Sequence, residues 1–384
     1  MFNNDIIKQL EKLPTPYYYY DIALLKETLK QVKNEVDKRG YILHYALKAN
    51  ANTKILKNIR DFGIGADCVS GNEIVKAISC GFAPQQVVFA GVGKSDDEIN
   101  IGLNNNIFCF NCESVQEMEV INELAAKKGG TARIAIRINP NVDAHTHHYI
   151  TTGLEENKFG LNIWDLENVL EKLKQFTNLK LISLHFHIGS QITDLSVFRS
   201  LCLRVNELIT WFEDRNIRLE HVNVGGGLGV DYHSPDAAAI PNFTEFFNEF
   251  ERFLELRPYQ KLHFELGRAL VAQCGNLLTR VLYVKPGVNT NFAIVDAGMT
   301  ELIRPALYQA YHKIENISST LPKQRYDVVG PICESSDCFG KAVMLPETRR
   351  GDLIVIRTAG AYGEIMASQY NLRKLPRCYY SDEL

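Results

Sequence analysis

The feature that most constrains the fold is an alternation of short apolar segments with stretches of helical periodicity. The segments that we interpret as strands cover residues 42–48, 64–69, 87–91, 107–111, 133–139, 181–187, 221–224 and 261–265. Alternating strands and helices predict a parallel sheet, and eight such units in about 240 residues are typical of a closed (β/α)8 barrel. An open, doubly wound sheet normally has a glycine-rich turn after its first strand. Residues 44–51 contain no glycine.

The pattern changes after about residue 265. Strand-like segments follow one another at 276–285, 291–296, 325–329, 341–345 and 352–358, and only residues 301–313 have a helical pattern. Such a succession predicts an antiparallel β domain. The run Pro16-Tyr-Tyr-Tyr-Tyr20 is β-prone and is expected to add a strand to it. We therefore expect an α/β protein with a TIM-like barrel over residues 22–264 and a β-barrel-like domain formed by residues 1–21 and 265–384.

Charge and composition argue against several partners. The chain has 42 Lys and Arg against 45 Asp and Glu, a formal charge of −3, so no basic field for nucleic acid is expected. No apolar run is long enough to span a bilayer, and residues 1–5 do not resemble the start of a signal peptide. Nine scattered cysteines indicate reduced thiols in a cytoplasm.

Two clusters could suggest a metal site, but we expect none. Cys109 and Cys112 have CxxC spacing without the second pair that a tetrahedral zinc site requires, and we interpret them as structural. His145, His147 and His148 have no acidic or cysteine ligands at regular spacing, so a solvated loop is the better interpretation.

Polar residues gather where the expected strands end. In a barrel of this class the carboxyl ends of the strands form one rim, where catalytic groups collect. A single strand-end lysine usually reaches solvent, but several polar residues at one rim favour chemistry for Lys48. The others are Asp67, Arg137, His185, His187, Ser190, the run Gly225-Gly-Gly227, Glu265 and Arg268.

A lysine, a glycine run and a carboxylate together suggest pyridoxal 5'-phosphate. The amine of Lys48 can form a Schiff base with the aldehyde. Backbone N–H groups of a glycine run can hold a phosphate, and a carboxylate such as Glu265 can keep the pyridine nitrogen protonated. His185 and His187 both belong to the motif that ends the sixth strand. We expect one to be structural and His187, nearer the rim, to stack on the ring.

Ordered motifs along nearly the whole chain resemble a known family. They are Tyr45-Ala-Leu-Lys-Ala-Asn50, Thr151-Thr-Gly-Leu, Asn157-Lys-Phe-Gly160, His185-Phe-His-Ile-Gly-Ser190, Gly225-Gly-Gly227, Glu265-Leu-Gly-Arg268, Asp296-Ala-Gly-Met299, Arg304-Pro-Ala-Leu-Tyr308, Cys333-Glu-Ser335 and Ala361-Tyr-Gly363. The sequence resembles the fold-type III pyridoxal-phosphate decarboxylases, related in plan to alanine racemase, and most closely those acting on diaminopimelate.

The resemblance implies roles for individual residues. Lys48 would carry the cofactor and Cys333 would return a proton to the α carbon. Cofactor contacts are implied for Asp67, His187, Ser190, Gly226, Gly227, Glu265, Gly267, Arg268 and Tyr362. Substrate contacts are implied for Arg268, Arg304, Tyr308, Glu334 and Tyr362. A homodimer with shared active sites is also implied, because the Cys333–Glu334 loop of this family reaches the partner subunit.

The implied reaction is decarboxylation of meso-2,6-diaminopimelate to L-lysine, the last step of lysine biosynthesis. A decarboxylase for ornithine, arginine or carboxynorspermidine is the main alternative, but those substrates lack the distal amino acid head that Arg304 and Glu334 could bind. An alanine racemase places an arginine at the pyridine nitrogen, which Glu265 contradicts. A cofactor-binding protein or an inactive paralogue could keep Lys48 but lose Cys333 or the substrate residues. All of these residues are present here, which argues against that alternative. The Thr300-Glu301 pair and the short tail at 371–376 depart from the family pattern at positions expected to affect packing.

Overall fold

The structure is a computed structural model that describes residues 2–142 and 158–384. The chain divides into two compact units. A helical unit contains Leu29–Gly229 and Asn242–Gly267, and a β-rich unit contains Met1–Thr28, Val230–Pro241 and Arg268–Leu384. The segment Val230–Pro241 therefore belongs to the β-rich unit, although it lies between two barrel strands in sequence.

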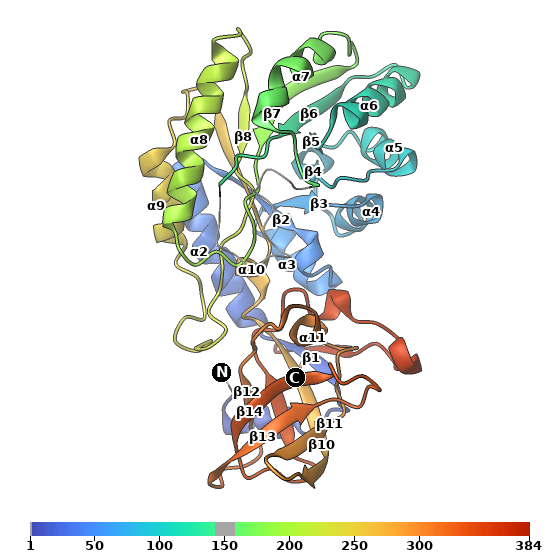
Figure 1. The fold of residues 1–384 in the computed structure, drawn as a ribbon, viewed down its shortest axis with the longest axis vertical. Coiled ribbons are helices and arrows are strands. Elements are labelled where there is room, and N and C mark those ends of the chain that lie inside the picture. The colour runs from blue at the N-terminus through green and yellow to red at the C-terminus, as the bar shows by residue number, and fades with distance from the viewer. Residues whose placement is uncertain (1, 143–157) are drawn as a thin grey trace. The chain divides into compact units, whose positions relative to one another are not determined.

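The helical unit is a closed barrel of eight parallel strands, which confirms the predicted fold class (Figure 1). Each strand pairs with the next, and the last pairs with the first, so that His44 lies opposite Glu265. The strands are β2 (Ile42–Ala46), β3 (Gly65–Cys68), β4 (Val87–Phe89), β5 (Cys109–Cys112), β6 (Ala132–Arg137), β7 (Leu179–His185), β8 (His221–Asn223) and β9 (Lys261–Leu266).

Helices lie between the strands and surround the barrel (Figure 1). They are α2 (Ile22–Arg39), α3 (Thr53–Asp61), α4 (Gly71–Ser79), α5 (Asp96–Asn104), α6 (Val115–Lys127), α7 (Leu166–Leu173), α8 (Ser196–Glu213) and α9 (Phe243–Phe253), with 3-10 turns η1 (Leu47–Ala49), η2 (Pro84–Gln86) and η4 (Ile163–Asp165). Local sequence fixes several starts: Ser70, Ser95 and Ser114 each accept a backbone N–H from the first helical turn. Such caps satisfy donors that a helix leaves unpaired.

The β-rich unit is a mostly antiparallel eight-stranded sheet, ordered β12-β15-β10-β11-β13-β14 with β1 between β10 and β16. Its strands are β1 (Tyr17–Tyr20), β10 (Gly275–Pro286), β11 (Asn291–Val295), β12 (Ile314–Asn316), β13 (Lys323–Val329), β14 (Cys338–Pro346), β15 (Leu353–Ile356) and β16 (Arg377–Tyr380). Its helical segments are α1 (Asn4–Leu10), α10 (Arg268–Val271), α11 (Arg304–Tyr308), η5 (Glu364–Met366) and η6 (Tyr370–Leu372).

Some local predictions for the β-rich unit need correction. The helix expected over 301–313 is only α11, because Gln309 ends it in the left-handed conformation at φ 52°. Strands β12 and β16 were not predicted; β16 pairs in parallel with the predicted tyrosine strand β1. Pairing with a distant strand, rather than local propensity, therefore defines this C-terminal segment.

The four tyrosines of β1 are buried in the core of the β-rich unit. The hydroxyl of Tyr17 donates to the carbonyl of Leu10 at 2.9 Å, and that of Tyr18 donates to the carbonyl of Glu301 at 2.7 Å. Buried phenols are tolerated where the O–H finds an acceptor. The tyrosine run is therefore a core strand whose hydroxyl groups also tie distant segments to it.

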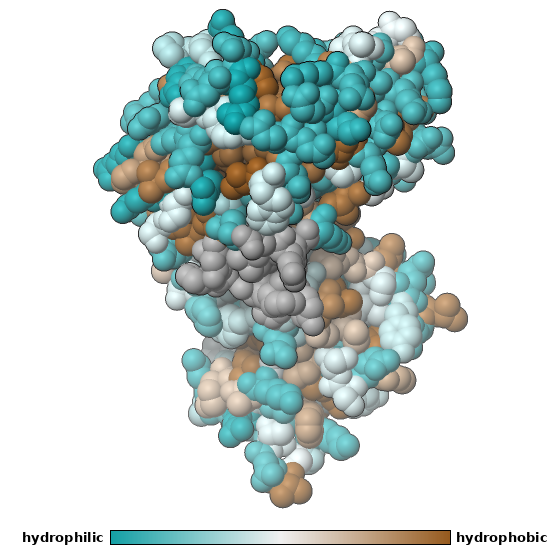
Figure 2. Space-filling model, turned by 45° about the horizontal axis from the view of Figure 1, so that its top comes forward, coloured by the Kyte–Doolittle hydropathy of each residue, from teal (hydrophilic) through white to brown (hydrophobic). Residues whose placement is uncertain are grey.

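The outer face of the helical unit is mainly hydrophilic in the view of Figure 2. Among the described residues, no helix combines the length and the apolar character needed to cross a membrane. The expected histidine loop at 145–148 and the motif beginning at Thr151 lie outside the described residues.

Candidate active site

Lys48 lies just beyond strand β2, in the one-turn helix η1 at the carboxyl end of the barrel. The neighbouring Leu47 and Ala49 are buried and anchor this turn, while Lys48 itself is half-buried. A Cβ added to Gly267 would meet the Cβ of Ala49 at 3.0 Å. The absence of a side chain at Gly267 thus lets the end of β9 pack closely against the turn that carries Lys48.

Glu265 projects from β9 into the barrel interior, and three side chains hold its carboxylate. Asn111 and Asn223 donate their side-chain N–H groups to Oε1 at 3.1 Å and 2.7 Å, and Nε2 of His185 lies 2.9 Å from Oε2. Burial alone would raise the pKa of Glu265, but the charge and hydrogen bond of His185, with the Lys48 amine, hold it well below its ordinary value. The carboxylate is therefore an anion, which suits a protonated ring nitrogen.

The two histidines of the HFH motif have different surroundings. His185 ends β7, and its ring contacts Glu265, which gives it a structural role. His187 lies past the strand, where its Nδ1 accepts the backbone N–H of Gly226 at 3.4 Å. Burial and the charges of Lys48 and Arg137 hold the pKa of His187 well below its ordinary value. A neutral imidazole is suited to stacking on an aromatic ring.

The glycine run after β8 fits tightly between neighbouring backbones. A Cβ on Gly226 would lie 2.0 Å from the carbonyl oxygen of Glu265, and one on Gly227 would lie 2.9 Å from that of Gly189. Gly227 also has φ 112°, a conformation that side chains rarely adopt. Glycine is therefore required here, beside the half-buried Ser190.

Asp67 supplies a buried acceptor in the same barrel. It lies on β3, and its Oδ1 has no hydrogen-bond partner among the described residues. Burial, together with the charge of Glu265, raises the pKa of Asp67 well above its ordinary value. A buried acceptor without a partner normally costs stability. Asp67 therefore fits a bound group that donates a hydrogen bond. Together, the barrel residues provide a lysine, an acid, an imidazole and a glycine turn that are suited to pyridoxal phosphate.

Arg137, the remaining strand-end cation, already has a structural partner. Its Nη1 lies 2.7 Å from Oε1 of Glu113, and both side chains are buried. Oε2 of Glu113 in turn accepts the backbone N–H of Gly160. Sequence alone gave Arg137 no assigned role, and this pairing supplies one within the helical unit.

The predicted substrate arginines lie together in the β-rich unit. Arg268 begins α10 and Arg304 begins α11, and both are buried. Each donates from Nη1 to the hydroxyl of Tyr232, at 2.6 Å and 2.7 Å. The ring of Tyr362 lies 4.9 Å from the Arg268 guanidinium, and Tyr308 ends α11 half-buried. Sequence analysis missed Tyr232, which no local motif distinguishes.

Cys333 and Glu334 are exposed in the loop between β13 and β14. The backbone N–H of Cys333 donates to the side chain of Asn371 at 3.3 Å, and Oε1 of Glu334 accepts the hydroxyl of Tyr370 at 2.8 Å. These bonds link the loop to η6. The structure thus shows the loop as an exposed feature of the β-rich unit, and the roles of both residues stay predictions.

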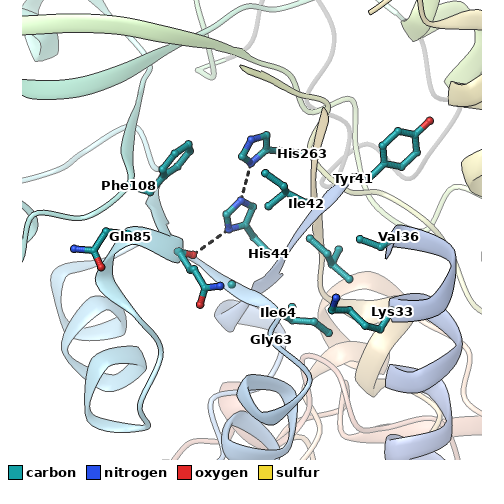
Figure 3. Close-up of a pocket in the computed structure, with 13 residues that line it drawn as sticks. Lys33, Val36, Tyr41, Ile42, His44, Gly63, Ile64, Gln85, Phe108 and His263 are labelled. Carbon is teal, nitrogen blue, oxygen red and sulfur yellow. Dashed lines mark hydrogen bonds between the residues drawn. The ribbon is translucent and has the colours of Figure 1, made fainter. Parts of the chain in front are cut away.

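A cavity of about 260 Å³ in the helical unit lies at the amino-terminal ends of the strands (Figure 3). It contains none of the predicted site residues. His44 lies 3.1 Å from the carbonyl oxygen of Gln86 and 2.9 Å from Nδ1 of His263, two contacts that Figure 3 marks with dashed lines. Nε2 of His263 lies 2.8 Å from Nδ1 of His221. Burial lowers the pKa of both His44 and His263. The row of histidine rings is therefore neutral, and the rings hydrogen-bond to one another.

The two cysteines of the CxxC pair are buried, and each thiol lies near the carbonyl of Phe110. Within the described ranges, no group of three or more His, Cys, Asp or Glu could hold a metal ion.

Comparison with known proteins identifies relatives over the whole chain. The family model described as "Pyridoxal-dependent decarboxylase, pyridoxal binding domain" matches residues 22–272. A diaminopimelate decarboxylase of Bacteroides thetaiotaomicron is 59% identical over 379 residues, covering 98% of each chain. A crystal structure of a mutant diaminopimelate decarboxylase from Helicobacter pylori, complexed with L-lysine, has 40% identity and a TM-score of 0.93, covering 99% of this chain and 94% of that one. A viral arginine decarboxylase shares the fold with a TM-score of 0.87 at 19% identity.

Proposed function

The chain belongs to the diaminopimelate decarboxylases, a family of pyridoxal-dependent decarboxylases, and from this premise we propose that it converts meso-2,6-diaminopimelate to L-lysine and CO2. It is accordingly a carbon–carbon lyase of lysine biosynthesis. The observation that carries the proposal is the buried carboxylate of Glu265, held by Asn111 and His185 inside a barrel whose rim carries Lys48. Because a viral arginine decarboxylase shares this fold, the fold alone does not indicate the substrate. The substrate is therefore inferred from the side chains of the site.

Residues of the barrel would hold the cofactor of this family. Lys48 would bind it covalently, His187 would contact the ring, and Gly226, Gly227 and Ser190 would receive the phosphate. When bound, pyridoxal phosphate accepts the electron pair released as the bond to the departing carboxylate breaks. Glu265 has the task of keeping a proton on the ring nitrogen, and its low pKa lets it do so as an anion throughout the neutral range. Asp67, Gly267, Arg268 and Tyr362 complete the proposed cofactor contacts.

Recognition of the substrate requires charges for a second amino acid head. The buried guanidinium groups of Arg268 and Arg304 suit its carboxylate, because arginine binds carboxylates with paired, charge-assisted hydrogen bonds. Glu334 suits its ammonium group, and Tyr308 and Tyr362 would border the site. Ornithine lacks the second carboxylate, which would leave one cationic site unfilled at a cost in affinity.

Cys333 would return a proton to the α carbon, and its loop supports a homodimer with shared sites. A general acid must lie within hydrogen-bond reach of the carbon that it protonates. Cys333 and Glu334 are exposed, and Asn371 and Tyr370 bond to the loop that carries them, which supports contact of this loop with a second subunit. All nine cysteines are free thiols, which supports the proposed cytoplasmic location.

A substrate panel tests this function. The purified holoenzyme should release CO2 from meso-diaminopimelate, with L-lysine formed in equal amount, and should release none from ornithine, arginine or carboxynorspermidine. Lys48→Ala should abolish turnover, while Lys94→Ala, which removes another barrel lysine at a structural ion pair, tests whether loss of any buried lysine has the same effect. Preferred turnover of ornithine, arginine or carboxynorspermidine would contradict the substrate assignment.

A further inference from the structure

Tyr232 joins the two arginines of the β-rich unit through a single oxygen atom. Its hydroxyl lies 2.6 Å from Nη1 of Arg268 and 2.7 Å from Nη1 of Arg304. Arginine has only donors, so both nitrogens donate and the phenol oxygen accepts twice. All three side chains are buried. The hydroxyl is therefore the shared acceptor of two guanidinium groups that are held close together.

Two buried cations this close repel each other unless negative charge lies between them. Burial would raise the pKa of Tyr232, but the charges of Arg268 and Arg304, together with their hydrogen bonds, bring it below its ordinary value. The two guanidinium groups thus favour negative charge on the phenol oxygen that they share. Within the described part of the chain, no carboxylate lies within ion-pair distance of Arg304. Arg304 therefore keeps its positive charge for an external anion.

The ring of Tyr232 is fixed from the other side. It meets the ring of His312 edge-on, with centroids 5.1 Å apart, and Nδ1 of His312 lies 2.9 Å from the carbonyl oxygen of Arg357. Arg357 also pairs with Asp236, on the same segment as Tyr232, at 2.6 Å. The segment is thus anchored at two points, which fixes where the hydroxyl presents itself to the arginines.

We propose that Tyr232 is a positioning residue that sets specificity for ligands with a distal carboxylate, by holding Arg268 and Arg304 as one preorganised anion site. This inference rests on the proposed function, in which the two arginines bind that carboxylate. Preorganisation raises affinity because the ordering cost is met before the ligand arrives. Decarboxylation removes only one carboxylate of diaminopimelate, so L-lysine keeps the head that this site would bind. The diamine 1,5-diaminopentane has the same carbon chain length between amines but no carboxylate.

Tyr232→Phe removes the shared acceptor and leaves the ring. We expect the holoenzyme to bind L-lysine about tenfold more weakly, measured by isothermal titration calorimetry, and to show a similar rise in KM for diaminopimelate. The kcat should stay within about twofold, because the hydroxyl acts through the arginines on binding. Binding of 1,5-diaminopentane should not change.

Tyr283→Phe is the matched control. Tyr283 lies on β10 of the same unit with its ring 4.9 Å from the Arg350 guanidinium, but it is exposed. This variant should bind L-lysine like the wild type. Thermal unfolding of each variant checks the fold. If Tyr232→Phe does not fold, Tyr232→Gln replaces it. The amide oxygen of Gln accepts from one arginine better than from two, so we expect lysine affinity to fall about threefold. Unchanged lysine affinity would overturn the inference.

The Arg304→Ala variant distinguishes failure of this inference from failure of the proposed function. If Arg304→Ala loses lysine affinity while Tyr232→Phe binds normally, the positioning role is wrong and the carboxylate site stands. Equal weakening of lysine and 1,5-diaminopentane by Tyr232→Phe would also overturn the role, because the effect would not depend on a carboxylate. If Arg304→Ala binds lysine normally, the proposed carboxylate site itself is wrong.

Discussion

Nε2 of His185 lies 2.9 Å from Oε2 of Glu265 across the interior of the barrel. The two residues are 80 positions apart in sequence and come from β7 and β9, which are separated by β8. Asn223, on β8, donates to the other carboxylate oxygen. Three consecutive strands thus converge on one buried anion, and this arrangement gives the first two predictions below.

Replacing Glu265 by Gln should remove the negative charge while keeping nearly the same shape. Without an anion, the ring nitrogen of the cofactor loses its proton and becomes a weaker electron acceptor. We expect kcat to fall by about 10² to 10³, as for other preorganised electrostatic groups. Steady-state CO2 release measures this, with the cofactor content of the variant as the control. Wild-type kcat in a fully loaded Gln variant would contradict the role.

His185→Asn should move the acid limb of the activity profile. The charge and hydrogen bond of His185 lower the pKa of Glu265, so their loss raises it. Because the ionised form is required, activity should begin to fall at a higher pH than in the wild type as pH decreases. A buried hydrogen bond to a charged group is worth about 1.5–3 kcal/mol, so kcat should drop by roughly 10- to 100-fold. The measurement is the profile of kcat against pH for the variant and the wild type. An acid limb at the same pH in both would exclude this role for His185.

His312 makes the fold sensitive to acid. Burial, with the charges of Arg304 and Arg268, lowers the pKa of His312 from 6.5 to about 3. Between these values the unfolded chain binds a proton that the folded chain does not, so the contribution is complete above pH 6.5 and is lost as pH falls toward 3. The slope is at most about 1.4 kcal/mol per pH unit.

His312→Gln should therefore flatten the dependence of unfolding free energy on pH below 6.5. Urea unfolding at several pH values measures it. His233→Gln, at an exposed position of the same unit, serves as the control and should keep the wild-type slope. Equal slopes in the His312 variant and the wild type would show that this residue does not titrate as described.

Gly226→Ala should damage the turn after β8. Its Cβ would lie 2.0 Å from a backbone oxygen of Glu265, and backbone cannot move aside as a flexible side chain can. We expect a loss of about 1–3 kcal/mol in unfolding free energy and weaker cofactor retention. Gly93→Ala is the control, because its Cβ would meet no atom within 4 Å. Equal stability of the two variants would mean that the turn tolerates a side chain.

Sequence reasoning reached the barrel because the alternation of strands and helices is a local signal, repeated eight times. It also placed Lys48 and Glu265 correctly at strand ends, since the ends of parallel strands share a rim. The direction of a side chain in a closed barrel depends on strand register, however, and β7 pairs with β6 through an irregularity. The contact between His185 and Glu265 therefore could not be read from alternation alone.

Tyr232 shows a second limit of local patterns. It lies 36 positions from Arg268 and 72 from Arg304, on a segment that interrupts the barrel in sequence but belongs to the β-rich unit. No spacing rule links residues so far apart. The short strand β16 escaped prediction for the same reason, because its partner β1 lies at the other end of the chain.

The central claim is that Lys48 holds the cofactor at the rim of this barrel. Borohydride reduction of the holoenzyme, followed by proteolysis and mass spectrometry, tests it most directly, because reduction makes the lysine–cofactor bond permanent. We predict a single pyridoxyl-modified peptide that contains Lys48. A modification at any other lysine, or none in enzyme that retains the cofactor, would contradict the account.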